Sequence, residues 1–349
     1  MRFTLLENCK EDMVVAENIY CESGNIFIKK SEKLTKNHLD FLNENLYSGL
    51  YIEDNFSNNV KINYPISPSL RNKLTISIKK IFEAVHQKKV LNYVEAANFI
   101  FKLSKNLINE IPKNKILDFL YIRNLTNYTF EHSVDTAIIS VVIGKNLNFE
   151  KEKLLELCVA ALFHNIGNMY ISKKLLDLDH KFSQSELEEI QKHTKLGYDL
   201  LKNTFKTPKN IYEVALTHHE RYDGTGYPLG LSSEEIPIFS RIISLSDWYN
   251  AITTKRSYRN AFISIEAFEY ISSNAGLHFD PNIVKIFVSK ISPYPAGTTI
   301  ILSDGRKGVV IENNESILTR PYVKTYGVDK TPTIIDLLEE TTLTIKSII

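Results

Sequence analysis

Apolar residues recur with the spacing of amphipathic helices along most of the chain between residues 68 and 291. The first stretch shows the order i, i+3, i+4, i+7 in Ile78, Ile81, Phe82 and Val85. This period of about 3.6 residues cannot be met by a strand, whose side chains alternate with a period of 2. The pattern predicts a mainly α fold and a helical hairpin before the central helical region.

The two ends of the chain have a different pattern. Near the N-terminus, a Ser23-Gly24 turn precedes the short extended stretch Ile26 to Ile28. Near the C-terminus, Ser303-Asp304-Gly305 separates two β-rich runs, which predicts a hairpin. We therefore predict four segments: an N-terminal α+β regulatory module (1–65), a helical hairpin or linker (66–115), a helical domain (116–292) and a small C-terminal β tail (293–349).

Composition excludes several classes of protein. The 42 basic and 41 acidic residues give a net charge of +1, which argues against a protein that coats a nucleic-acid polymer or a membrane surface. No apolar run approaches the ~18 residues of a spanning helix. Acidic residues interrupt the first 13 positions, where a secretory signal needs an apolar stretch. We expect a cytoplasmic protein that does not cross a membrane.

Histidines are concentrated in the helical region. Seven of the nine histidines lie between residues 116 and 292, and they include His132, His164, His193, His218 and His219. A single histidine on a helix is more often packed or solvated than a ligand, but five in one region favour a metal centre. Neutral imidazole is the commonest transition-metal ligand, and metal pairs about 4 Å apart activate water for phosphoester hydrolysis. The pattern predicts such a centre.

The local contexts of these histidines sharpen this interpretation. His164-Asn165 follows an apolar run, the stretch HHERYDGTGYP begins at His218, and Asp247 lies within EEIPIFSRIISLSDWYNAITTKRSYR. In these motifs, and in their order and spacing, the chain resembles the HD-GYP family of metal-dependent phosphohydrolases associated with cyclic di-GMP. The resemblance implies a helical HD-domain bundle and hydrolysis of cyclic di-GMP by attack of an activated water on phosphorus.

The resemblance also implies ligands for two divalent metal ions, with iron or manganese expected and one or two ions per chain. One set would be His132, His164 and Asp247. The other would be His193, His218 and His219. For the substrate, the resemblance places Arg256 and Arg259 toward the phosphates. Gly226 would allow a tight loop close to the nucleotide, and Tyr227 would stack on or border a guanine base. Each of these four also has a plain structural interpretation, as a solvated helix end, a turn or a packed ring.

Two positions depart from the family pattern. Asn165 replaces the aspartate that bridges the two metals, and Asn168 replaces the lysine that meets the substrate phosphate. A carboxylate offers two anionic oxygens, whereas an amide offers one neutral oxygen and an NH₂ group that repels a cation. We expect reduced occupancy of at least one metal site and weakened or lost catalysis. A single metal held by His132, His164 and Asp247 remains compatible with this change.

Two classes of function stay open at this point. The chain is either a slow cyclic di-GMP phosphodiesterase or a non-catalytic receptor or interaction scaffold with a signalling protein as partner. Homodimerisation through residues 68–112 is a further alternative. Glu131 and Glu220 each stand beside a predicted ligand and are candidates to orient its imidazole.

Overall fold

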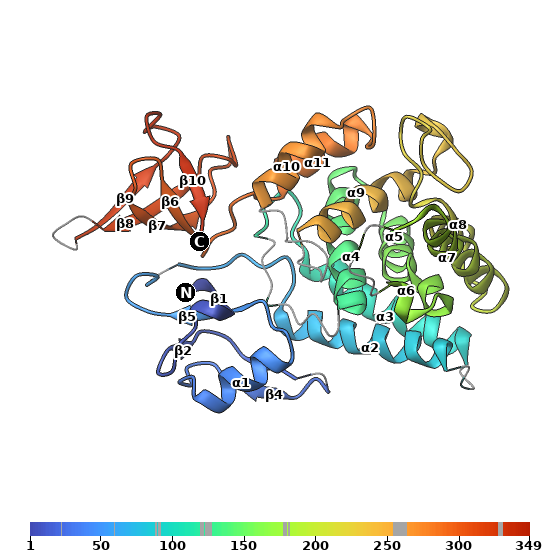
Figure 1. Cartoon of the computed structure of the whole chain (residues 1–349). Coiled ribbons are helices and arrows are strands. Elements are labelled where there is room, and N and C mark those ends of the chain that lie inside the picture. The colour runs from blue at the N-terminus through green and yellow to red at the C-terminus, as the bar shows by residue number, and fades with distance from the viewer. Residues whose placement is uncertain are drawn as a thin grey trace. The chain divides into compact units, whose positions relative to one another are not determined.

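A computed structural model describes the chain except residues 22, 59, 88, 90–91, 119–121, 123–127, 177–179, 181, 254–263 and 327–330. The fold is mainly α, with small sheets near both termini, as the sequence predicts (Figure 1). The described chain divides into two compact units. The helical unit comprises residues 69–114 and 129–288, and the sheet unit comprises residues 1–68, 115–128 and 289–349. The predicted boundaries at 65, 115 and 292 stay predictions.

The helical unit is built from long helices joined by short connections. Its helices are α2 (Pro68–His86), α3 (Tyr93–Glu110), α4 (Tyr128–Asn146), α5 (Lys151–Phe163), α6 (Lys173–Leu176), α7 (Gln184–Asn203), α8 (Lys209–Thr217), α9 (Ile238–Ile252), α10 (Ser264–Ser273) and α11 (Pro281–Lys290). Short 3₁₀ turns, η3 (Ile166–Tyr170) and η4 (Ser233–Glu235), interrupt the connections. The apolar side chains of these helices are mostly buried, as expected for amphipathic helices that pack against one another.

Helix α4 lies at the centre of this core, because every residue from His132 to Gly144 is buried. Helix α5 packs against α3 and α8, and α7 packs against α8 and η3. Helix α7 begins where Ser183 and Glu186 form a reciprocal capping box. Helices α5 and α8 also contact α9, so α5, α7, α8 and α9 lie together around the candidate site.

The N-terminal part of the sheet unit has two small sheets and one helix. Strands β1 (Arg2–Leu5), β5 (Gly49–Glu53) and β2 (Val14–Val15) form an antiparallel sheet in the order β1-β5-β2. Strands β3 (Ile19–Tyr20) and β4 (Ile26–Ile28) pair separately, and α1 (Lys36–Glu44) covers the core that includes Leu42 and Leu50.

The C-terminal part is a five-stranded antiparallel sheet in the order β10-β6-β7-β8-β9. Its strands are β6 (Thr299–Leu302), β7 (Lys307–Glu312), β8 (Tyr322–Tyr326), β9 (Pro332–Asp336) and β10 (Ile345–Ile348). Strands β6 and β7 pair around the predicted 303–305 turn, which confirms that hairpin. Val60 packs on Ala296 and Val309, so residues from both ends of the chain share one small core.

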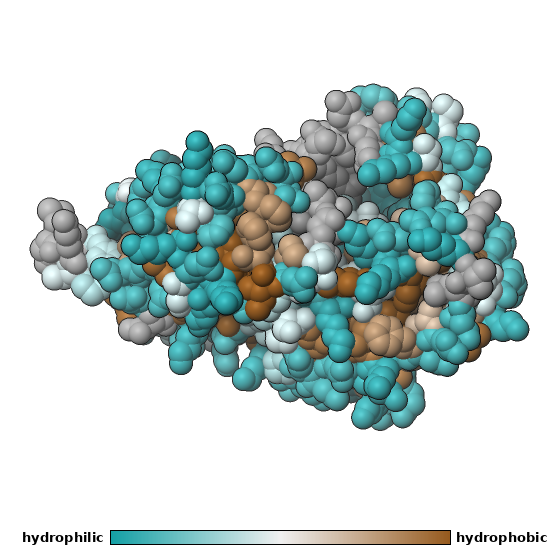
Figure 2. Space-filling model, turned by 90° about the horizontal axis from the view of Figure 1, so that it is seen from below, coloured by the Kyte–Doolittle hydropathy of each residue, from teal (hydrophilic) through white to brown (hydrophobic). Residues whose placement is uncertain are grey.

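The surface is mostly polar on the face drawn in Figure 2, where hydrophobic side chains are confined to smaller areas. Among the residues described, no helix is both long and apolar enough to cross a lipid bilayer.

Candidate metal centre

Six side chains with metal-binding atoms converge inside the helical unit, and they form two groups of three. Within each group, one ligand atom per residue lies within 4.8 Å of the others. The three-histidine group is His193, His218 and His219. The mixed group is His132, His164 and Asp247. Both sets match the residues singled out in the sequence.

The ends and middles of five helices supply these ligands. His132 lies on α4, His193 on α7 and Asp247 on α9. His164 directly follows α5 and His218 directly follows α8, where each caps its helix. The His164 and His218 ring centroids are 5.1 Å apart, so the two groups are neighbours.

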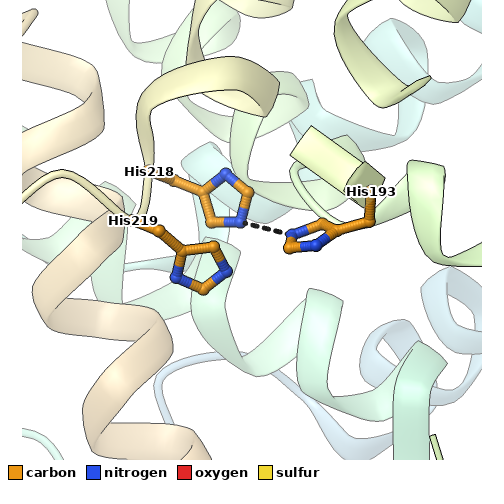
Figure 3. A group of neighbouring side chains, drawn as sticks. All are labelled: His193, His218 and His219. Atoms are coloured by element: carbon orange, nitrogen blue, oxygen red, sulfur yellow. Dashed lines mark hydrogen bonds between the residues drawn. The ribbon is translucent and has the colours of Figure 1, made fainter. Parts of the chain in front are cut away.

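The imidazoles of the three-histidine group gather around one point, and the His193 ring is steeply inclined to those of His218 and His219 (Figure 3). The Nδ1 atoms of His193 and His218 lie 2.7 and 2.9 Å from the carbonyl oxygens of Ile190 and Val214. A carbonyl can only accept a hydrogen bond, so in the neutral rings these Nδ1 atoms carry the protons. The Nε2 lone pairs of His193 and His218 then face each other across 3.4 Å.

Burial keeps the three-histidine group neutral. It lowers the pKa of His193 to about 4 and that of His219 to about 3, and it also lowers the pKa of His218. Removing an imidazole from water penalises its cationic form, and the neighbouring histidines add to that penalty. At neutral pH the three rings are therefore in the protonation state that binds a cation.

In the mixed group, Asp247 lies between two imidazoles. Its Oδ1 atom is 2.7 Å from His132 Nε2 and 3.3 Å from His164 Nε2. Burial alone would raise the pKa of Asp247, but the contacts with His132 and His164 hold that pKa well below its ordinary value. Asn250, one turn further along α9, donates a hydrogen bond to the His132 carbonyl and joins α9 to α4.

Asn165 contacts His164 of the mixed group. Its Nδ2 atom is 2.7 Å from His164 Nε2. His164 Nδ1 lies 2.7 Å from the Ala161 carbonyl and so carries the ring proton. The Asn165 amide therefore lies against the ring nitrogen of His164 that would bind a metal, and Asp247 Oδ1 is 3.3 Å from the same nitrogen.

A pair of glycines lets the Asn165 segment approach α7 closely. A Cβ atom on Gly167 would lie 1.9 Å from the His193 carbonyl oxygen and 2.7 Å from the Gly197 nitrogen. Only glycine fits at such a distance, so η3 can pack directly on α7. This contact brings His164 and Asn165 beside His193.

The loop that follows His219 covers one side of the three-histidine group. Tyr227 stacks on the His219 ring with 4.8 Å between centroids, and burial raises the pKa of the Tyr227 hydroxyl. A Cβ atom on Gly226 would lie 2.3 Å from the Arg221 nitrogen, so this tight turn requires glycine.

The contacts of Glu220 differ from the expected one to an imidazole. Its buried carboxylate accepts hydrogen bonds from the backbone N–H groups of Leu229 and Leu231, at 2.7 and 3.1 Å. A buried carboxylate requires donors, and the loop backbone supplies them. Glu220 therefore fixes the loop that carries Tyr227. The signal for this in the sequence is a charged residue just before a turn rich in glycine.

The structure describes some of the remaining predicted site residues and not others. Asn168 lies in η3, and its buried Oδ1 atom has no hydrogen-bond partner among the described residues. Arg256 and Arg259 lie outside the described residues. Glu131 lies 3.3 Å from Arg71 on α2.

The chemistry of the donor atoms fits divalent metal ions. Five imidazoles and one carboxylate suit transition metals with mixed nitrogen and oxygen coordination. Three protein ligands per group leave coordination positions for water or substrate, which is the arrangement of catalytic rather than structural metal sites.

Comparison with known proteins places these residues in a family context. Residues 122–283 match the HD domain family. The chain is 28% identical over 250 residues to the cyclic di-GMP phosphodiesterase PA4108 of Pseudomonas aeruginosa, covering 72% of this chain and 60% of that protein. It is 29% identical to the cyclic di-GMP phosphodiesterase PdeB of Borreliella burgdorferi, covering 71% and 72%.

Among solved structures, the fold is similar to Bd1817, a HDG"Y"P protein from Bdellovibrio bacteriovorus. The TM-score is 0.51 and the identity 14%, over 82% of this chain and 97% of the other. The likeness shows a shared fold.

Proposed function

The chain belongs to the HD-GYP family of HD-domain proteins, and from this premise we propose that it is a metal-dependent cyclic di-GMP phosphodiesterase with weakened turnover. The observation that carries the proposal is the pair of adjacent three-ligand groups, which retain five histidines and Asp247. An abandoned site would have no reason to keep all six. Two curated relatives are cyclic di-GMP phosphodiesterases, which supports the same nucleotide as substrate.

Different residues of this chain would bind the metal ions, the phosphates and the bases of the nucleotide. The two groups would hold one or two divalent ions, iron or manganese. When bound, these ions supply Lewis-acid stabilisation of phosphate charge and lower the pKa of water. Arg256 and Arg259 would offset the two phosphate charges, because guanidinium groups bind phosphate oxygens in a bidentate way. Tyr227 and the turn at Gly226 would border the guanine bases.

Two amides weaken this machinery. Asn165 cannot supply the shared anion that lets two cations approach each other, and Asn168 cannot supply a cation to a phosphate. The amide contact between Asn165 and His164 supports the first of these losses. We propose that the chain acts in the cytoplasm in cyclic di-GMP signalling.

The second candidate is a receptor or scaffold that binds the nucleotide or a signalling protein without turnover. Two observations favour the receptor. Asn165 and Asn168 lie within five residues of each other, and each removes a charged group that the family pattern has. The loop that carries Tyr227 is nevertheless in place beside His219. Homodimerisation through 68–112 remains an additional proposal.

Turnover of cyclic di-GMP separates the two candidates. The unaltered protein, Asn165→Asp and Asn165→Asp with Asn168→Lys are loaded anaerobically with Fe²⁺ or Mn²⁺, and products are quantified. We expect slow hydrolysis by the unaltered protein and at least about tenfold faster hydrolysis by Asn165→Asp, which corresponds to ~1.4 kcal/mol in the barrier. His193→Ala is the inactive control.

Rapid hydrolysis by the unaltered protein would contradict the impaired site. If all three proteins bind the nucleotide and none of them hydrolyses it, the result would favour the receptor.

A further inference from the structure

We propose that Asn165 is an internal competitor for metal, and that the metals therefore bind in order, the three-histidine group first and the mixed group second. This inference rests on the metal centre of the proposed function, but it concerns metal binding alone. It assigns Asn165 an active role, beyond the absence of a bridging carboxylate.

The first step of the argument concerns the His164 lone pair. The Ala161 carbonyl fixes the ring proton on Nδ1, which leaves Nε2 as the only atom of His164 that can bind a metal. The Asn165 Nδ2 atom lies 2.7 Å from that same Nε2, and Asp247 Oδ1 lies 3.3 Å from it. A metal ion can bind His164 only after the Asn165 amide has turned away from this nitrogen.

The second step concerns the rest of the mixed group. Asp247 and His132 contact each other at 2.7 Å, so their ligand atoms also satisfy each other before any ion arrives. An ion entering this group displaces both contacts. An aspartate at position 165 would have the opposite effect, because its oxygens and the His164 lone pair repel each other until a cation separates them.

The third step concerns the three-histidine group. Its His193 and His218 rings carry their protons on Nδ1, so the facing Nε2 atoms at 3.4 Å are two acceptors without a proton between them. A cation placed between them turns a repulsion into two bonds. All three ligands are imidazoles, which favours Fe²⁺, Co²⁺ or Zn²⁺ over Mg²⁺.

Titration of the metal-free full-length protein with Co²⁺ tests the role of Asn165. Visible absorption follows coordination. The only tryptophan, Trp248, adjoins Asp247 and stacks on Tyr270 at 4.3 Å, so its fluorescence reports on the mixed group. We expect two steps, with the fluorescence change in the weaker one.

Removal of the amide should strengthen that weaker step. Asn165→Ala should bind the second ion about threefold to tenfold more tightly, the effect of losing one competing hydrogen bond. Asn146→Ala is the matched control, because Asn146 donates to the Val142 carbonyl on α4, remote from the ligands in sequence. Asn165→Val, which also lacks the amide hydrogens, serves if the alanine variant folds poorly. Equal or weaker second-ion binding in these variants would overturn the competitor role.

Two ligand variants test the order. His219→Gln should abolish the tight step, and Asp247→Ala should abolish only the weak step. The reverse assignment would overturn the proposed order. The titration contains no nucleotide, so a protein without phosphodiesterase activity could still show ordered metal binding. Conversely, metal binding in another order would not change the outcome expected in the turnover experiment.

Discussion

Three imidazoles buried side by side make the stability of the folded chain depend on pH. Below pH 6.5 the unfolded chain protonates His193, His218 and His219, whereas burial lowers their pKa values in the folded protein. The unfolded state then binds more protons, so the free energy of unfolding decreases as the pH falls.

The metal-free protein should therefore lose stability between pH 6.5 and 4. Each histidine contributes up to about 1.4 kcal/mol per pH unit. Urea unfolding at several pH values measures this loss, and His219→Gln should make the decline shallower. A free energy of unfolding that stays constant from pH 7.5 to 5 would contradict it.

Glu220 holds the Tyr227 loop through two backbone N–H groups. Replacing Glu220 by Ala leaves both donors without their acceptor, which should cost about 1–3 kcal/mol of unfolding free energy. Thermal or urea denaturation checks the value, with the exposed Glu234→Ala as control. Equal stability of the two variants would show that Glu220 does not fix the loop.

At the scale of residues, the sequence predicted which ligands meet but not how neighbouring polar groups pair. The family resemblance implied the six candidate ligands, and the structure brings their side chains into two groups. The Asn165 contact with His164 and the Glu220 contact with the loop depend on where a side chain turns. Those orientations follow from packing that spacing does not encode.

At the scale of elements, a buried ion pair joins α2 to α4. Arg71 on α2 contacts both carboxylate oxygens of Asp135 on α4, at 2.7 and 2.9 Å, and the side chains are 8% and 1% exposed. Because α4 carries His132 one turn before Asp135, this pair anchors the helix that supplies a ligand.

Arg71→Met should destabilise the protein by about 3–5 kcal/mol, because it removes the guanidinium group from a buried ion pair. Lys105→Met, an exposed cation on α3, should change stability by no more than about 0.5 kcal/mol. Chemical denaturation of both variants measures the difference. A loss below 1 kcal/mol for Arg71→Met would contradict an anchoring role.

Helices with strong apolar periodicity were predictable, and weaker elements were not. The stripe through Ile78 and Phe82 is buried as expected. On α3, Ile100, Leu103 and Leu107 are also buried, but Phe99 beside them is 47% exposed. Strand β10 was missed because its few residues carry little pattern, and its place in the sheet depends on pairing with β6, some 40 residues earlier.

At the scale of the whole molecule, one buried carboxylate joins three distant stretches of the sheet unit. Asp118 accepts hydrogen bonds from the backbone of Asn63 and Ala296 and from the side chain of Asn313. Sequence patterns treated the N-terminal module and C-terminal tail as separate segments. Their union in one unit rests on long-range contacts of this kind, which no local period predicts.

Asp118→Ala should destabilise the sheet unit by several kcal/mol, because three donors lose one acceptor and each costs about 1–3 kcal/mol. Hydrogen exchange of the amides of Asn63 and Ala296 localises the effect, and the exposed Glu315→Ala is the control. Unchanged protection of these amides would contradict the role of Asp118.

The central claim is that Asn165 weakens the binding of a second metal ion, so that the second ion is lost when free metal is removed. The most direct test is the number of ions retained per chain after loading with Fe²⁺ or Mn²⁺ and removal of free metal, measured by elemental analysis. We predict about one ion in the unaltered protein and about two in Asn165→Asp, because a carboxylate can bridge two cations. Two tightly held ions in the unaltered protein would contradict the claim.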